Sequence, residues 1–148
     1  MTIPEFAREW ARSLGADESK LFPLKGGINN LVYACGSPRG KFVLKGYTSP
    51  GESVVDRLQA EADFLRYANL VAPGFVPKLI EVDTERRCIV MERIDGSSYQ
   101  AGENPCIYDV HAAAKFFKLL NIDKSVAREI VRLPAAEGFA KLTDHLRT

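Results

Sequence analysis

The sequence has few residues of the types that bind metals or form disulfides. Its 148 residues include three cysteines and two histidines, and no C-x-x-C pair occurs. The cysteines are Cys35, Cys88 and Cys106, and the histidines are His111 and His145. Zinc sites and disulfide frameworks need closely spaced sets of such residues. We therefore expect no metal site and no disulfides, and reduced thiols favour a cytoplasmic location.

Long apolar runs are also missing. No stretch approaches the roughly 18 to 20 apolar residues that cross a bilayer. Residues 1–15 carry four charged side chains in place of the apolar core of a signal peptide. The sequence thus predicts a protein that does not bind or span a membrane.

An excess of charge of either sign is absent as well. Lys and Arg together number 20, Asp and Glu number 19, and the net charge is +1. Nucleic acid and anionic membranes attract proteins mainly through surplus positive charge, so the balance gives no reason to expect either partner. Hydrophobic residues make up 46% of the chain and charged residues 26%, which is ordinary for a globular protein.

The hydrophobic patterns that are present predict an α+β fold. Helical spacing occurs in residues 4–14, 53–71 and 107–120 and again near 139–146, while β-rich segments occupy residues 21–24, 31–35, 41–47, 76–82 and 88–94. Hairpin-length turns join the strands and one helix interrupts them, which favours a five-stranded antiparallel sheet with one packed helix. Ser53 and Asp56 suggest a capping box at the start of that helix. We expect a first unit at 1–96, a linker at 97–105 and a partly formed helical unit at 106–148.

The loop from Lys25 to Asn30 is the first candidate binding element. Gly26 and Gly27 allow the backbone to pass close to a ligand, and its free N–H groups could surround phosphate oxygens. Asn29 completes the Gly-Gly-Ile-Asn-Asn motif. The alternative is a plain hairpin loop in which these residues only supply positive φ angles.

Lys45 and Glu61 form the second candidate. Alternation along the strand places Lys45 on the same face as Val43, an unusual position for a cation without a partner. Glu61 falls within the apolar stripe of the following helix, between Leu58 and Leu65, where a lone carboxylate would be costly. The sequence therefore predicts an ion pair between strand and helix. The alternatives are an edge-strand lysine and a solvated glutamate that only flanks the stripe.

The segment Ile89–Gly96 is the third candidate. A buried strand there runs into a connector whose backbone groups could meet the edge of a planar base. Taken alone, the same residues could be an ordinary strand end.

Together these segments resemble the N-terminal lobe of the kinase-like phosphotransferases, the group of aminoglycoside phosphotransferases and choline kinases. Residues 26–33 are similar to the family's phosphate-covering loop and second strand, 43–45 to its lysine strand, 57–65 to its glutamate helix, and 90–96 to its hinge. The resemblance implies that the full protein transfers a phosphoryl group from ATP to a hydroxyl of a small molecule. It also implies that Lys45 contacts the phosphates and that Glu61 pairs with it. The Glu92 carbonyl and the Ile94 amide would contact adenine.

The chain departs from this family at the catalytic loop. The family's H-x-D motif, with an asparagine five residues after the aspartate, is absent. We therefore expect no catalytic residue and no metal ligand in this chain, and Mg²⁺ binding only with a further C-terminal lobe. The chain is expected to be truncated, inactive in transfer, and able to dimerise through exposed apolar surface.

Two other interpretations remain open. One is a non-catalytic module that binds a nucleotide or a protein, and the other is the lobe of a protein kinase. The Gly-Gly-Ile-Asn-Asn loop departs from the glycine pattern of protein kinases, which disfavours the second. The acceptor of the phosphoryl group does not follow from these residues.

Overall fold

A five-stranded antiparallel sheet organises the computed structural model, which describes residues 3–24, 30–47, 56–97, 99–100 and 102–131. The elements are α1 (Glu5–Ser13), a short 3₁₀ helix (Glu18–Lys20), β1 (Phe22–Pro23), β2 (Asn30–Ser37), β3 (Gly40–Tyr47), α2 (Arg57–Val71), β4 (Leu79–Asp83), β5 (Cys88–Glu92), α3 (Ile107–Leu120) and α4 (Lys124–Ile130). The strand order is β1-β2-β3-β5-β4, and every neighbouring pair is antiparallel. The predicted α+β fold is confirmed.

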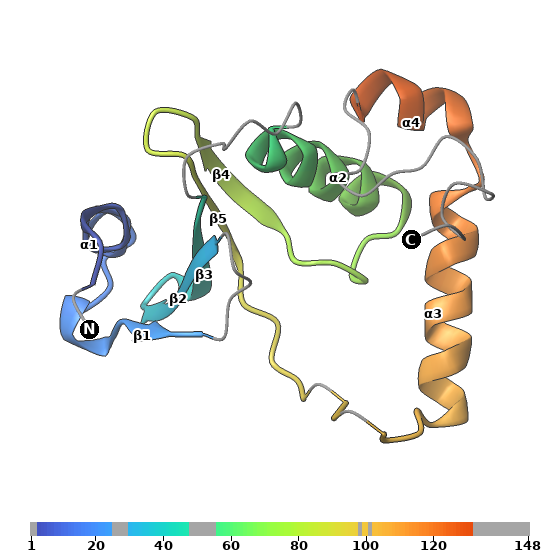
Figure 1. Cartoon of the computed structure of the whole chain (residues 1–148), viewed down its shortest axis with the longest axis horizontal. Coiled ribbons are helices and arrows are strands. Elements are labelled where there is room, and N and C mark those ends of the chain that lie inside the picture. Colours follow the sequence, from blue (N-terminus) through green and yellow to red (C-terminus); the bar gives the residue numbers. More distant parts are fainter. Residues whose placement is uncertain (1–2, 25–29, 48–55, 98, 101, 132–148) are drawn as a thin grey trace, which may run out of the picture.

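Helix α2 packs on one face of the sheet (Figure 1). Its inward side chains Leu58 and Leu65 form a core with Tyr47 of β3 and with Ile89 and Met91 of β5. Since β3 and β5 lie at the centre of the sheet, this core holds the middle of the sheet against α2. The same face of β3 carries Lys45, which the sequence analysis singled out.

Helix α1 covers the opposite face of the sheet, a position that the sequence pattern did not predict (Figure 1). Ala7 and Ala11 of α1 are fully buried against a cluster that includes Phe42 and Leu44 of β3. Small side chains on α1 let the helix approach the strands closely. The sheet therefore lies between two helices, and β3 is enclosed on both faces.

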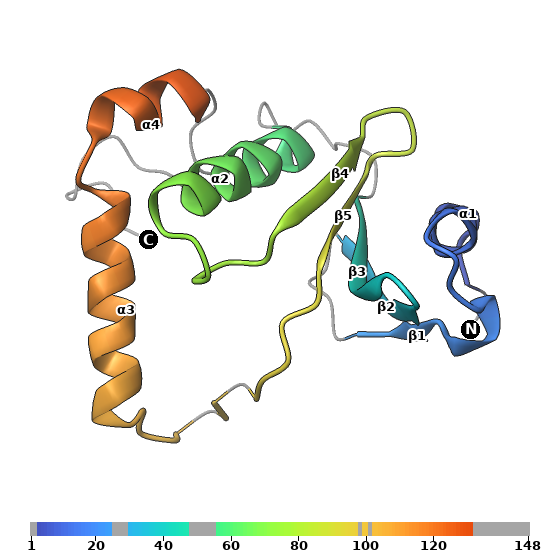
Figure 2. The same cartoon turned by 180° about the vertical axis from the view of Figure 1, so that it is seen from behind.

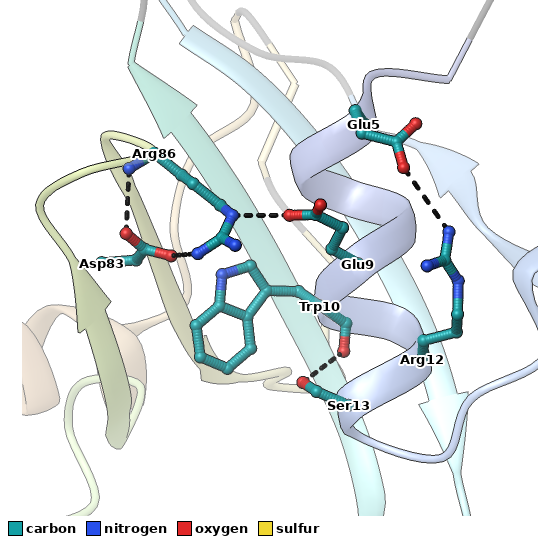
Figure 3. Close-up of polar contacts among 7 residues, drawn as sticks. All are labelled: Glu5, Glu9, Trp10, Arg12, Ser13, Asp83 and Arg86. Atoms are coloured by element: carbon teal, nitrogen blue, oxygen red, sulfur yellow. Dashed lines mark hydrogen bonds and ion pairs between the residues drawn. The ribbon is translucent and has the colours of Figure 1, made fainter.

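A polar cluster, which we call the α1 clamp, ties α1 to the turn between β4 and β5 (Figure 3). Arg86 donates from Nε to Glu9 at 2.5 Å and from Nη1 to Asp83 at 2.9 Å. The Arg86 amide also donates to Asp83 at 2.9 Å. The Trp10 indole lies between the helix and this turn. The clamp joins elements that are more than seventy residues apart, as the Arg86–Glu9 separation of 77 positions shows.

The clamp should give the protein a pH-dependent stability. Burial opposes the ionisation of Asp83, but its hydrogen bonds from the Arg86 amide and guanidinium outweigh burial and lower the Asp83 pKa below 3.8. A lowered folded-state pKa stabilises the fold fully above the unfolded-state pKa, and this stabilisation is lost as pH falls through the folded-state value. Asp83→Asn should therefore lower the free energy of unfolding by about 1 kcal/mol at about pH 7 and by much less at about pH 2. Urea unfolding at both pH values measures this.

The matched control for this prediction is Glu85→Gln, an exposed carboxylate of the same turn that lies outside the clamp. It should leave the free energy of unfolding nearly unchanged at both pH values. Equal losses of stability at the two pH values in Asp83→Asn would contradict the assigned role of the Asp83 charge.

Helix α2 begins later than the capping box predicts. Asp56 is itself the N-cap, with an extended backbone at φ −72° and ψ 99°, and its side chain accepts from the amides of Leu58 and Gln59. The prediction of Asp56 as the third helical residue is therefore wrong, because a carboxylate at the N-cap satisfies amides that have no partner within the helix. Ser53, the other half of the predicted box, lies outside the described residues.

Helix α3 stands away from the sheet and meets α2 and the turn that follows α2 (Figure 2). The Tyr67 hydroxyl of α2 donates to the Leu120 carbonyl at 2.7 Å, and the rings of Phe75 and Phe116 stack at 5.5 Å. Large apolar side chains along α3 and just beyond it are exposed, namely Ile107, Tyr108, Val110, Phe117 and Ile122. Dimerisation through this surface stays a prediction.

The last described helix, α4, was not predicted from the sequence. Asp123 caps it by accepting from the amides of Ser125 and Val126. An aspartate directly before a helix is a recognisable N-cap, but this helix spans only seven residues and shows too little of a hydrophobic period. The helix expected near residues 139–146 lies outside the described part. No helix within the described ranges is both long and apolar enough to cross a membrane.

Candidate functional site

The predicted ion pair between β3 and α2 is present. Lys45 Nζ donates to Glu61 Oε2 at 2.5 Å, and the side chains are 19% and 30% exposed. β3 directs Lys45 toward α2 because it alternates with Phe42 and Leu44, which face α1. Both charges are shielded from bulk water but not sealed from it, so the pair is open to a third, anionic group.

Tyr47 lies beside this pair and was not singled out from the sequence. The Lys45 ammonium is 5.4 Å from the centre of its ring, a distance suited to a cation–π interaction. Burial of the phenol, and then the negative charge of Glu61, raise the Tyr47 pKa well above its ordinary value. The hydroxyl therefore stays protonated and can donate a hydrogen bond. Alternation along β3 from Lys45 would have placed it on this face, but an aromatic two residues on is ordinary for a core strand.

The glycine-rich loop can be followed only at its end. Asn30 is the first residue of β2 and lies directly opposite Tyr47 of β3. Its Oδ1 atom is buried and has no hydrogen-bond partner among the described residues. Gly26, Gly27 and Asn29 lie outside the described part, so the proposed cradle for phosphates stays a prediction. In the sequence, the loop nevertheless leads into the end of β2 that pairs with the end of β3, where Tyr47 follows Lys45 by two residues.

The connector leaves the sheet after Glu92, two residues before the strand end that the sequence predicted at Ile94. The Glu92 amide donates to the Lys78 carbonyl at 2.9 Å, and the Arg93 amide donates to the Lys41 carbonyl at 2.9 Å. The Ile94 amide makes no backbone hydrogen bond to any residue in the described part, and its side chain is 56% exposed. One backbone donor is thus available at the position where the sequence predicted contact with a base.

Charged side chains hold this connector against β3. Lys41 Nζ donates to Asp95 at 2.5 Å, and the Lys41 hydrogen bond and charge lower the Asp95 pKa. The Arg93 guanidinium lies 5.1 Å from the centre of the Phe22 ring. Lys41 and Lys45 share one face of β3, so this face links the connector with the ion pair.

A separate cavity of about 750 Å³ lies at the other edge of the sheet, between α2 and β4. Its lining residues include Arg66 and Asn69 of α2, Lys78 and Leu79 at the start of β4, and Glu92 at the end of β5. The ion pair does not line it.

Comparison with known protein families agrees with this geometry. The family described as the phosphotransferase enzyme family matches residues 20–146. The chain belongs to this family. The resemblance read from the four sequence segments is therefore confirmed, and phosphotransferase chemistry is the activity that the family shares. No protein with a curated description matches the chain.

For a phosphotransferase, the described residues offer few groups for chemistry on the acceptor. Within them, no cluster of three or more His, Cys, Asp or Glu side chains could hold a metal ion. His111 is exposed on α3, where the following residues are Ala112 and Ala113, and His145 lies outside the described part.

Proposed function

We propose that this chain binds ATP as the nucleotide-binding part of a phosphotransferase that acts on a hydroxyl of a small molecule. The observation that carries the proposal is the half-buried Lys45–Glu61 pair on the face of β3 next to the end of the β2–β3 hairpin. Phosphoryl transfer depends on positioning and charge neutralisation, and a cation held in place by a carboxylate would supply both.

The residues present fit a nucleotide at both ends of the site. Lys45 supplies the positive charge for the phosphates, and Glu61 holds its side chain in place. Toward the connector, the Ile94 amide, which has no backbone partner among the described residues, suits a ring nitrogen of adenine, as the Glu92 carbonyl suits its amino group. The Lys41–Asp95 pair fixes this connector against β3, which supports a defined distance between the two ends.

We expect the acceptor and the metal ion to be bound by groups other than the nucleotide-binding residues just named. Mg²⁺, when bound, would neutralise charge on the phosphates. No H-x-D motif that could hold a base for the acceptor hydroxyl occurs in the sequence. We accordingly expect this chain alone to bind nucleotide without transferring its phosphoryl group.

Calorimetric titration of the chain with ATP tests the proposal. We expect saturable binding tighter than about 1 mM, competition by ADP, and weaker binding of adenosine, because adenosine lacks the phosphates that Lys45 would contact. Absence of binding by ATP up to several times this concentration would overturn the proposal. Equal affinities for ATP and adenosine would contradict the role of Lys45.

The rival function is a module that binds a protein and no nucleotide. The exposed apolar side chains of α3 are the observation that favours it. The same titration separates the two functions, because a protein-binding module would show no heat of binding with ATP.

A further inference from the structure

Arg87, the last residue of the turn between β4 and β5, occupies its place at two costs. Its backbone is left-handed, with φ 49°, and no other non-glycine residue in the described ranges has a positive φ. Glycine adopts this conformation without steric cost, whereas a Cβ atom is crowded there. In addition, the Nε atom of Arg87 is buried and donates to no residue that the structure describes. Such costs persist only where the surroundings fix a residue, and they commonly mark a functional role.

The contacts of Arg87 join the end of β3 to the start of α2. Its carbonyl accepts from the Tyr47 amide at 2.8 Å, which ties its backbone to the last residue of β3. Its guanidinium donates from Nη2 to Asp56 Oδ1 at 3.3 Å. The same oxygen caps α2 by accepting from the amides of Leu58 and Gln59. Arg87 therefore connects the strand that carries the lysine to the first turn of the helix that carries the glutamate.

This connection fixes where α2 begins on the sheet. Among the described residues, the Arg87–Asp56 pair is the polar contact that joins the first turn of α2 to the β4–β5 hairpin. Glu61 follows Asp56 by five residues, or roughly 7.5 Å along a helix axis. A shift of the first turn would therefore also move Glu61 relative to Lys45. A hydrogen bond of 2.5 Å between their side chains does not tolerate a large shift.

We propose that Arg87 is a positioning residue that fixes the N-terminus of α2 and thereby holds Glu61 against Lys45 for the binding of a nucleotide phosphate. The identity of the ligand rests on the function proposed above. The effect of Arg87 on the Lys45–Glu61 pair rests only on contacts within this chain. The side chains of Arg87 and Asp56 are 28% and 46% exposed, so water partly screens their attraction. We therefore expect a moderate effect on the site and not its loss.

Arg87→Gly separates positioning from stability. Glycine relieves the left-handed backbone, which offsets the lost ion pair, so the melting temperature should change by less than about 2 °C. The Lys45 amine should become more reactive, because Glu61 no longer holds it in one position. Acetylation by N-hydroxysuccinimidyl acetate without nucleotide, followed by mass spectrometry of peptides, measures this. Lys45 should react at least about threefold faster, with the exposed Lys20 as internal reference.

Arg86→Gly is the matched control, since it makes the same substitution at the neighbouring position of the turn. Arg86 has no positive φ and holds the α1 clamp, so glycine there removes the clamp without relieving the backbone. It should lower the melting temperature by about 4 °C and leave the acetylation rate of Lys45 unchanged. Opposite behaviour of the two variants would support the proposal. Faster acetylation of Lys45 in neither variant, or in both to the same extent, would overturn it.

Asp56→Asn tests the other side of the contact. Asparagine caps a helix about as well as aspartate but lacks the charge that attracts Arg87. The variant should speed the acetylation of Lys45 as Arg87→Gly does. Combining the two substitutions should add little, because both remove one contact. An unchanged rate in Asp56→Asn, or additive effects in the double variant, would contradict the assigned role of the Arg87–Asp56 pair.

A second readout concerns the ligand. Arg87→Gly should weaken ATP binding by about three- to fivefold in calorimetric titration, and Arg86→Gly should not change it. Unchanged ATP affinity in Arg87→Gly would overturn the role of Arg87 in nucleotide binding. If the natural chain binds no ATP but the acetylation rates of Lys45 differ as expected, the proposed function fails and the positioning of Glu61 by Arg87 stands.

Discussion

Lys45→Ala should weaken ATP binding by about 10- to 100-fold. A hydrogen bond to a charged group contributes about 1.5–3 kcal/mol, and each 1.4 kcal/mol corresponds to roughly a tenfold change in affinity. The Lys45 side chain is only 19% exposed, so solvent screens its attraction for a phosphate less than at an open surface. Calorimetric titration of the natural chain and the variant, under one salt concentration, measures the change.

The control for this prediction is Lys20→Ala. Lys20 carries the same charge, is 76% exposed, and lies 4.0 Å from Asp17 outside the sheet. Its loss should change the affinity for ATP by less than about twofold, since exposed charges are screened by water and salt. Equal affinities of Lys45→Ala and the natural chain would show that Lys45 does not contact the nucleotide. Circular dichroism of each variant checks that the fold is kept.

Gly46→Val should strongly destabilise the fold. A Cβ atom at Gly46 would lie 2.5 Å from Cζ and 2.7 Å from Cε1 of Phe6, well inside contact distance. β3 is covered by α1 on that face, so the added side chain can be accommodated only by moving Phe6 or the helix. Overpacking of this kind costs about 1–3 kcal/mol or more, and we expect at least about 3 kcal/mol. Urea unfolding measures the free energy directly.

The neighbouring strand offers a matched control in Gly36→Val. A Cβ atom at Gly36 would meet nothing within 4 Å, so the same substitution there should change the free energy of unfolding by less than about 0.5 kcal/mol. Adding Phe6→Leu to Gly46→Val should restore part of the lost stability, because leucine lacks the ring atoms at the contact. Equal losses at Gly36 and Gly46 would contradict close packing of α1 on β3.

The Lys45–Glu61 ion pair was predictable because the side-chain alternation of a strand and the helical spacing of a helix each place one of the two charges on a packed face. Alternation along β3 placed Lys45 on the face of Val43, and helical spacing placed Glu61 between Leu58 and Leu65. A helix that packs on a sheet must bring those two faces together, and opposite charges that approach in a half-buried space will pair. The distance of 2.5 Å confirms this reasoning.

Other features were not predictable because they depend on where elements dock. Residues 4–14 showed an amphipathic helix, but its period does not say which face of which sheet it covers. The contact between Phe6 and Gly46 and the clamp between Glu9 and Arg86 arise only after the chain has folded back on itself. Helix α4 escaped prediction for a different reason, since it is too short for a clear period.

The sequence by itself thus determined the antiparallel sheet, one helix packed on it and the Lys45–Glu61 pair, because these follow from local periods and from burial of apolar faces. Only the tertiary structure decided that α1 covers the second face, that Asp56 caps α2, and that Arg87 joins this cap to the β4–β5 hairpin. These features depend on side chains from distant segments sharing one space, and the order of residues along the chain does not specify that arrangement directly.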